Sequence, residues 1–278
     1  MEIQLNSGHS IPAVGLGTFR AKGDDVYKAV LHALETGYRH LDSAVIYGNE
    51  EEVGRGLADS SVPREDVFVT TKVWNGAHTR EEAARMIDES LERMGTSYLD
   101  LVLIHWPYTY ERNAAVYAAM EDAVEAGKVR SIGISNFNIH HIDALLSTAR
   151  ITPAVNQMEC HVNLQNTRLK DYLDGKGIAL EAYAPFKSHY VEDVLGNETL
   201  QKIGTAHGKT PTQVSLRWLL QRGIIVLPKS VTPKRIEENF QVFDFELSDE
   251  EMHEIRKLNR GQRLFTEPDN MDNGFVEL

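Results

Sequence analysis

Residues 99–106 read LDLVLIHW, a nearly continuous apolar run that ends in a histidine and a tryptophan. A strand with apolar side chains on both faces is typical of a parallel sheet that helices cover on either side. The run is far shorter than the ~18 apolar residues that a membrane crossing needs, and no other stretch approaches that length. The segment therefore predicts a central strand of an α/β fold.

Similar short runs alternate with helical periods along the whole chain. Eight such runs in 278 residues, each followed by a helical segment, predict a single (β/α)8 barrel, the TIM barrel. A doubly wound open sheet is the alternative, but the eightfold count and the missing dinucleotide fingerprint disfavour it. The predicted strands are Val14–Thr18, Arg39–Ala44, Val67–Val73, Leu99–Trp106, Val129–Ser135, Ala154–Glu159, Ala179–Tyr183 and Ile224–Lys229.

The segments between these runs carry helix signals. Capping boxes at 79–82 and 248–251, and threonine–proline pairs at 210–211 and 232–233, mark expected helix starts. Glycines at 37, 95, 127 and 177 stand where helices are expected to end. One amphipathic helix is predicted by the apolar spacing of Val26, Ala29, Val30, Ala33 and Leu34.

The first residues predict a separate small element. The turn signal Asn6-Ser7-Gly8 separates two short runs, so we expect a β-hairpin that caps the bottom of the barrel. No Pro/Gly/Ser-rich linker divides the rest. We therefore predict one domain over 1–278, made of a hairpin (1–13), a barrel (14–260) and a C-terminal tail (261–278).

The composition excludes several classes of function. A net charge of −12 without a long basic stripe disfavours nucleic-acid binding, and the missing apolar span disfavours a membrane protein. Cys160 is the single cysteine, so no intrachain disulfide can form, and we interpret it as a buried small residue. Met1 leads into no secretory signal pattern. Together these features predict a cytoplasmic protein.

Ionisable residues lie at the carboxyl ends of three consecutive predicted strands. Asp42 and Tyr47 follow the second, Lys72 closes the third, and His105 closes the fourth. Chemistry in such barrels lies at the carboxyl ends of the strands, so we expect these side chains to meet there. The simpler interpretation is a structural Asp–Lys pair with two unrelated polar residues.

A catalytic interpretation accounts for all four side chains. Asp42 would hold Lys72 charged, and the ammonium group would lower the pKa of the Tyr47 phenol by up to about three units. Tyr47 would then act as a general acid near neutral pH, while His105 orients the same substrate oxygen. This arrangement favours reduction of a carbonyl by a hydride from a cofactor.

The motifs around these residues resemble the aldo-keto reductase superfamily over nearly the whole chain. The motifs are GYRHLDSA (37–44) with YGNE (47–50), KVW (72–74), LIHWP (103–107), GISNF (133–137) and LPKSVTP (227–233). The resemblance implies a catalytic tetrad of Asp42, Tyr47, Lys72 and His105. It also implies NADPH-dependent reduction of aldehydes, ketones, dicarbonyls or keto sugars to alcohols.

The same resemblance assigns residues to the cofactor. Ser135, Asn136 and Gln157 would bind the nicotinamide carboxamide, Tyr183 would stack on the nicotinamide ring, and Thr18 would also lie at the cofactor site. By resemblance, Glu238 and Asn239 would meet the adenine. Without the resemblance, Tyr183 would be interpreted as a core aromatic residue.

A small basic cluster follows the last predicted strand. Lys229, Ser230 and Arg235 surround a helix start near residue 232, where backbone N–H groups and the helix dipole suit a phosphate. The two cations suit a 2′-phosphate, which favours NADPH (and NADP+) over NADH. The alternative interpretation is a solvated helix start.

Aromatic residues predict the substrate wall. Phe19, Trp74 and Trp106, with Tyr47 and His105, are expected to bind substrate. Phe19 and Ala184 differ from residues common in the family, and the contacts of the loop after Ala184 are left open. The resemblance implies that the tail from Arg263, with Phe265 and Phe275, shapes the choice of substrate. This tail is short, as in bacterial members that include diketogluconate reductases.

Other functions compete with this interpretation. A Schiff-base aldolase would need a neutral Lys72, which Asp42 opposes. A nucleotide-binding sensor or regulatory protein on the same fold is the further alternative, although this chain starts almost at the barrel. The pair His140–His141 lacks metal-ligand spacing and partner residues. The segment 269–274 resembles a calcium loop only weakly, because Met271 occupies a ligand position and the later acidic ligand is missing. No metal is therefore expected. A monomer is expected by resemblance.

Overall fold

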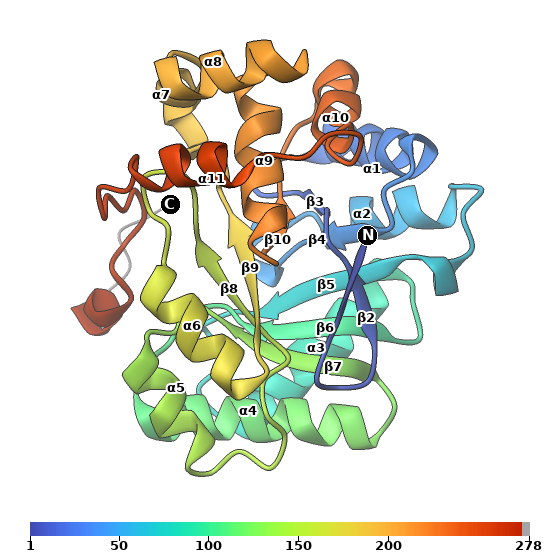
Figure 1. The fold of residues 1–278 in the computed structure, drawn as a ribbon. Helices are drawn as coiled ribbons and strands as arrows, with labels where there is room; N and C mark the ends of the chain where they lie inside the picture. Colours follow the sequence, from blue (N-terminus) through green and yellow to red (C-terminus); the bar gives the residue numbers. More distant parts are fainter. Residues whose placement is uncertain (274–278) are drawn as a thin grey trace.

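The computed structural model describes residues 1–273, and its centre is an eight-stranded parallel sheet (Figure 1). Each strand pairs with its neighbour along the chain, so the order follows the sequence. The strands are β3 (Leu16–Gly17), β4 (His40–Asp42), β5 (Phe68–Val73), β6 (Leu99–Ile104), β7 (Val129–Ser135), β8 (Val155–Glu159), β9 (Ala179–Tyr183) and β10 (Ile225–Leu227). All eight lie within the predicted runs.

The first and last strands close the sheet into a barrel. Parallel bridges join Val14 to Val226 and Gly17 to Lys229, and the Gly15 N–H donates to the Val226 carbonyl at 2.9 Å. Gly15 allows this approach, because a Cβ atom there would lie 2.7 Å from Leu227 Cδ2 on the last strand and 2.6 Å from His40 Nδ1. The predicted (β/α)8 barrel is confirmed.

Helices surround the barrel in Figure 1. The predicted capping boxes at Thr79 and Ser248 are both formed, and Gly37, Gly95 and Gly177 adopt the left-handed conformation at helix ends. The helices are α1 (Gly23–Thr36), α2 (Glu50–Ala58), α3 (Arg80–Met94), α4 (Tyr110–Glu125), α5 (Ile139–Leu146), α6 (Thr167–Lys176), α7 (Val191–Leu195), α8 (Glu198–His207), α9 (Pro211–Gln221), α10 (Pro233–Phe240) and α11 (Asp249–Arg256). Short 3₁₀ turns are η1 (Val45–Tyr47), η2 (Arg64–Asp66), η3 (Ser188–Tyr190) and η4 (Pro268–Asn273).

The N-terminal hairpin closes one end of the barrel, as predicted. Strands β1 (Glu2–Gln4) and β2 (Ser10–Pro12) pair antiparallel, and the Asn6 side chain donates to the Pro153 carbonyl just before β8. Leu5 and Ile11 are buried in an apolar cluster at the amino ends of the strands. The other members of this cluster are Phe68, Leu101, Leu103, Ala154, Val155 and Ile225.

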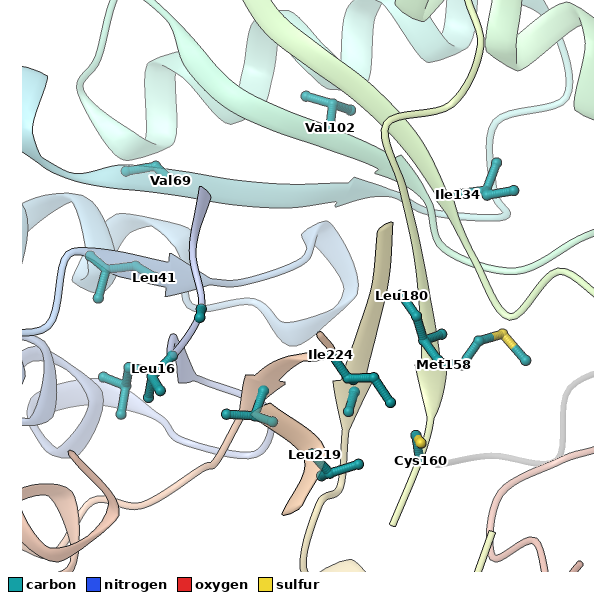
Figure 2. Close-up of a cluster of buried hydrophobic side chains, with 14 of the residues drawn as sticks. Leu16, Leu41, Val69, Val102, Ile134, Met158, Cys160, Leu180, Leu219 and Ile224 are labelled. Carbon is teal, nitrogen blue, oxygen red and sulfur yellow. The ribbon is translucent and has the colours of Figure 1, made fainter. Parts of the chain in front are cut away.

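The main core lies between the strands and the helices. Figure 2 shows its side chains on successive strands, including Leu41, Val69, Val102, Ile134 and Leu180. Because neighbouring residues of a strand point to opposite faces, the residues next to these point into the barrel. The lumen is therefore apolar near the hairpin and polar near the carboxyl ends, where Asp42, Lys72 and Glu181 lie.

The fold bears on the predicted burial of Cys160 and on the expectation that no helix crosses a membrane. Cys160 is fully buried in the main core, and burial raises the pKa of its thiol to about 11, so it behaves as the predicted small buried residue. In the part of the chain that the structure describes, no helix combines the length and apolar character needed to cross a membrane.

Candidate active site

The four residues of the predicted tetrad meet at the carboxyl ends of neighbouring strands. Asp42 ends β4, Tyr47 ends η1, Lys72 lies near the end of β5, and His105 directly follows β6. The Tyr47 and His105 rings lie edge to face with centroids 5.7 Å apart, and Lys72 Nζ lies 5.2 Å from the Tyr47 ring centroid. Barrel topology explains the meeting, because parallel strands deliver their ends to one rim.

Asp42 and Lys72 form a buried ion pair beneath the tyrosine. Lys72 Nζ donates to both carboxylate oxygens of Asp42 at 2.7 Å and to the Ser43 carbonyl at 2.9 Å. Lys72 is fully buried and Asp42 is 3% exposed. An ammonium group has three N–H donors, and here all three are used. The lysine is therefore held charged, and it is a poor candidate for the neutral nucleophile of an aldolase.

An aromatic wall surrounds the partly exposed Tyr47 ring. The Phe19 ring lies 5.1 Å from the Tyr47 ring, and the Trp74 ring lies 5.3 Å from that of His105, measured between centroids. Trp106 is buried next to His105 and lines a small cavity together with Trp74. Phe19 and Trp74 thus lie at the mouth of the site, where substrate contacts were predicted.

The pKa of Tyr47 differs from the sequence-based expectation. The pKa of the phenol is raised well above 10, first by desolvation and then by the charges of Asp42 and Glu181. Desolvation of the phenol therefore outweighs the lowering that Lys72 was expected to cause, and the carboxylate that pairs with Lys72 opposes that lowering too. In the protein as described, Tyr47 is a protonated phenol across the neutral range.

His105 is a neutral imidazole. Its pKa is lowered well below 6.5, mainly by desolvation and then by the positive charge of Lys72. Its Nδ1 atom is buried and has no hydrogen-bond partner among the described residues, while its backbone carbonyl accepts from Asn136 Nδ2 at 3.0 Å. A neutral ring of this kind can donate one N–H to a substrate oxygen without adding charge.

Sequence reasoning missed a second polar group beneath the tetrad. Glu181 and His40 are fully buried in the lumen, and the Gln157 amide donates to Asp42 Oδ2 at 2.8 Å and to Glu181 Oε2 at 2.7 Å. Desolvation and the Asp42 charge raise the pKa of Glu181 to about 8, and desolvation lowers the pKa of His40 to about 3.

His40 Nε2 lies 3.7 Å from Glu181 Oε1, yet both groups are uncharged near pH 7, so this contact is not an ion pair at that pH. The signal in the sequence was an ionisable residue at an inward position of the otherwise apolar strand Ala179–Tyr183. Position 181 faces inward because it lies two residues before Tyr183, on the same side of the strand.

The residues expected to bind a nicotinamide are joined in one network. The Tyr183 hydroxyl donates to Asn136 Oδ1 at 2.8 Å, and Asn136 Nδ2 donates to Ser135 Oγ at 3.1 Å. Ser135 Oγ in turn donates to the Gln157 carbonyl at 3.0 Å. The hydroxyl of Thr18 donates to the Asp42 carbonyl at 2.9 Å, which places this residue beside the tetrad.

Unusual backbone conformations gather around the same rim. Asn136 has a φ of 65°, and the segment after β9 contains Ala184 at 50°, Lys187 at 62° and Ser188 at 49°. Non-glycine residues in the left-handed region cost free energy and are found preferentially at ligand sites. Arg20 also has a positive φ, of 58°. Its side chain contacts His189 on the other side of the rim.

The basic cluster lies where it was predicted, at the start of α10. The hydroxyl of Ser230 accepts from the Thr232 N–H at 3.0 Å, and Thr232 precedes the first residue of the helix. Lys229 and Arg235 are exposed, and no carboxylate of the described residues lies within ion-pair distance of either side chain. Desolvation and the neighbouring charge of Arg20 lower the pKa of Lys229, whereas Asp25 opposes them.

Two residues predicted to meet an adenine lie further along α10. Glu238 accepts from the hydroxyls of Thr210 and Thr212 at 2.9 and 3.2 Å, so its carboxylate already fastens the start of α9. Asn239 is buried at 6% exposure. Their contact with a cofactor stays a prediction.

The C-terminal tail returns to the site. Phe265 packs edge to face on Tyr183, with centroids 5.3 Å apart. Phe275, the other aromatic residue of the predicted substrate tail, lies outside the described residues.

The tail also changes one expectation about the pair His140–His141, which was thought to have no acidic partner. Asp269 Oδ1 lies 3.3 Å from His140 Nε2 and 3.6 Å from His141 Nε2. Asp269 also accepts from Asn138 Nδ2, and His141 Nδ1 accepts from the Asn138 N–H. These bonds fasten the tail to α5 and account for the cluster.

A groove of about 700 Å³ lies beside this contact, between α5, α6 and residues 259–261. Amide and aliphatic side chains make up much of its lining, including Asn138, Gln165 and Asn166. The groove lies away from the tetrad and holds none of its members. The barrel rim therefore remains the place where acid–base groups converge.

Comparison with known proteins gives consistent matches. A model of the Aldo/keto reductase family matches residues 13–260. The chain is 43% identical over 270 residues to glyoxal reductase from Bacillus subtilis, covering 97% of this chain and 96% of that protein. It is 39% identical over 268 residues to methylglyoxal reductase DkgA from Escherichia coli, covering 96% of each chain.

A solved structure is also very similar. The crystal structure of MGS-M4, an aldo-keto reductase enzyme from a Medee basin deep-sea metagenome library, superposes with a TM-score of 0.95. Its sequence is 52% identical, and the match covers 96% of this chain and 98% of that one.

Proposed function

The chain belongs to the aldo/keto reductase family and is an oxidoreductase of carbonyl and alcohol groups, and we propose that it reduces aldehydes, ketones, dicarbonyls or keto sugars with NADPH. The observation that carries the proposal is the geometry around Tyr47. A partly exposed phenol lies above the buried Asp42–Lys72 pair and beside a neutral imidazole.

In this proposal Tyr47 is the general acid. A bound NADPH would supply the hydride that the carbonyl carbon accepts. The Tyr47 hydroxyl donates a hydrogen bond to the carbonyl oxygen and passes its proton there as the C–O single bond forms. Because the raised pKa keeps the phenol protonated at neutral pH, the donor form is the dominant one.

Lys72 and His105 support the proton transfer. The Lys72 ammonium, 5.2 Å from the Tyr47 ring centroid, favours the negative charge that develops on the phenol oxygen. The neutral His105 donates its N–H to the same substrate oxygen and fixes its direction. Asp42 holds the ammonium in place, since both of its oxygens accept from Lys72.

The nicotinamide end of the site fits the proposed cofactor. Both N–H groups of the Gln157 amide are used by Asp42 and Glu181, which leaves the Gln157 oxygen as an acceptor for the amide of a carboxamide. The Tyr183 ring is partly exposed and is held at its hydroxyl by Asn136. Ser135 and Thr18 would complete this end.

The phosphate end fits as well. Lys229 and Arg235 are exposed cations without a carboxylate at ion-pair distance among the described residues, and they flank the start of α10 with Ser230. Cations, a hydroxyl and helix N–H groups together suit a phosphate group, and a 2′-phosphate would distinguish NADPH from NADH. Glu238 and Asn239 would lie toward the adenine.

The substrate class follows from the wall of the site and from the relatives. Phe19 and Trp74 are partly exposed and offer an apolar surface beside the tetrad, while the buried Trp106 lines a small cavity together with Trp74. Relatives named for glyoxal and methylglyoxal support small dicarbonyls as substrates. We further propose a single-domain, monomeric, cytoplasmic enzyme, divided at residues 13 and 260 as the sequence predicts.

The proposal is tested by following nicotinamide absorbance with purified protein and a panel of methylglyoxal, glyoxal and aromatic aldehydes. NADPH and NADH are compared in parallel. Faster loss of the NADPH signal is expected. Binding of NADPH without consumption across the panel would instead favour a nucleotide-sensing protein on the same fold.

Tyr47→Phe is the matched variant for this assay. It keeps the ring packing against Phe19 and His105 but removes the proton, so turnover should fall by roughly 10²–10⁴ while NADPH binding persists. Turnover close to that of the unmodified enzyme would show that another group supplies the proton.

A further inference from the structure

Glu159 is a buried carboxylate at the end of β8 that the proposed chemistry does not use. Its side chain is fully buried, and it accepts hydrogen bonds from the backbone N–H groups of Leu264 at 2.8 Å and Phe265 at 3.1 Å. His161 Nε2 lies 3.0 Å from the same carboxylate. A buried carboxylate is costly unless it is hydrogen-bonded, so these backbone donors hold the tail firmly at two successive residues.

The tail residue held in this way packs on the ring proposed to meet the nicotinamide. Phe265 contacts Tyr183 edge to face, with a centroid distance of 5.3 Å and an interplanar angle of 82°. At its other end, the Tyr183 hydroxyl donates to Asn136 Oδ1 at 2.8 Å. The Tyr183 ring is thus fixed at two points, one on the barrel and one on the tail.

The connection between the tail and the barrel is continuous. The Asn163 carbonyl accepts from the N–H groups of Arg260 and Gln262 at 3.0 and 3.2 Å, and the Gln165 side chain donates to the Ile255 carbonyl at 3.0 Å. Residue 159 at the end of β8 and residues 161, 163 and 165 in the segment that follows are all buried. Figure 1 shows the chain after α11 passing beside this region.

We propose that Glu159 is a positioning residue for the cofactor, because it fastens the tail so that Phe265 holds the Tyr183 ring in its stacking position. The inference rests on the proposed function, in which Tyr183 stacks on the nicotinamide. It gives the tail a role in cofactor binding that does not depend on any contact with substrate. The chain of contacts runs from Glu159 to the backbone of Phe265, then to Tyr183.

The experiment measures binding of NADPH alone, by titration calorimetry, to the full-length protein. Glu159→Gln keeps one side-chain oxygen and places an amide N–H group opposite one of the two backbone donors, and Phe265→Leu removes the ring contact. Each is expected to weaken NADPH binding by roughly 3- to 10-fold, the scale of an aromatic pair. The losses of affinity should not add in the double variant, because both changes break the same chain of contacts. The double variant should therefore bind NADPH about as well as whichever single variant has the lower affinity.

Matched controls separate this role from general stability. Glu267→Gln removes a tail carboxylate whose partners are Arg263 and Asn138 rather than Tyr183, and Phe243→Leu removes an exposed ring elsewhere. Both should bind NADPH as the unmodified protein does. Phe265→Tyr keeps the edge-to-face ring and should restore the affinity that Phe265→Leu loses. Thermal melting of every variant confirms that each is folded.

The outcomes are distinct. Weakened NADPH binding by both single variants, with an unchanged KM for the carbonyl, would support the inference. Unchanged NADPH binding, additive losses in the double variant, or a change confined to the carbonyl KM would overturn it. Failure of the unmodified protein to bind NADPH would overturn the proposed function, and this inference with it.

Discussion

The two ends of the candidate site are built in opposite ways. At the acid–base end, Lys72 is fully buried and all its N–H groups are used by Asp42 and Ser43. At the phosphate end, Lys229 and Arg235 are exposed, with no carboxylate at ion-pair distance among the described residues. The acid–base end is therefore part of the folded core, whereas the cations of the basic end remain available to the proposed ligand.

This contrast separates stability from affinity. A change to Asp42 or Lys72 should disturb folding as well as chemistry, because it leaves a buried charge without its partner. A change at the basic end should alter ligand binding and leave the fold intact, because exposed charges contribute little to stability.

The largest effect is expected from Lys72→Met. Removing the ammonium leaves the Asp42 carboxylate buried without its partner, so the free energy of unfolding should fall by about 3–5 kcal/mol. Urea unfolding measures this loss. The double variant Lys72→Met/Asp42→Asn removes the stranded charge and should recover part of it. A single variant as stable as the unmodified protein would show that the pair is not a structural element.

Glu181→Gln tests the protonation state of the carboxyl group buried at the acid–base end. The pKa of Glu181 is raised from 4.5 to about 8, so the native state binds a proton that the unfolded state releases between these values. The stability of the unmodified protein should therefore fall, relative to the variant, by up to about 1.4 kcal/mol per pH unit across this window. Above pH 8 the difference should level off.

Urea unfolding of both proteins at several pH values between 4.5 and 9 checks this sign. The amide introduced by Glu181→Gln still offers an oxygen to Gln157, so the hydrogen bond at this position is retained. Unfolding free energies that stay parallel over the whole range would mean that Glu181 is ionised in the native protein at neutral pH.

The smallest effect on the fold is expected at the basic end. Arg235→Ala should leave the unfolding free energy unchanged and weaken NADPH binding by about tenfold or more, the scale of a hydrogen bond to a charged group. NADH binding should change little, since it lacks the 2′-phosphate. Lys234→Ala, an exposed cation on the same helix turn, controls for general charge. Equal losses for both cofactors would remove Arg235 from 2′-phosphate recognition.

The sequence predicted the frame of this protein well. Every barrel strand falls within a predicted run, and α1 buries the five apolar residues whose spacing predicted it. Local chemistry accounts for this success, because strand runs, capping boxes and terminal glycines act over a few residues. The meeting of Asp42, Tyr47, Lys72 and His105 was also predictable, since barrel topology sends consecutive strand ends to one rim.

What the sequence could not determine was the electrostatic balance inside the barrel. Sequence reasoning predicted the Asp42–Lys72 pair but expected the ammonium to lower the pKa of the Tyr47 phenol. In the fold, desolvation raises that pKa instead, and Glu181 adds its charge from a strand 139 residues beyond Asp42 (181 − 42). Desolvation depends on the depth of each group, and depth is set only when all eight strands close.

The tail illustrates the same limit. The sequence of the tail contains aromatic residues but does not indicate what they contact. The contacts from Glu159 to Phe265, and from Phe265 to Tyr183, join three separate parts of the chain. The sequence by itself determined the elements, their order and the rim where the reactive groups gather. Only the tertiary structure decided how strongly burial shifts the pKa of each reactive group and which ring the tail holds, because both depend on contacts between residues far apart in the chain.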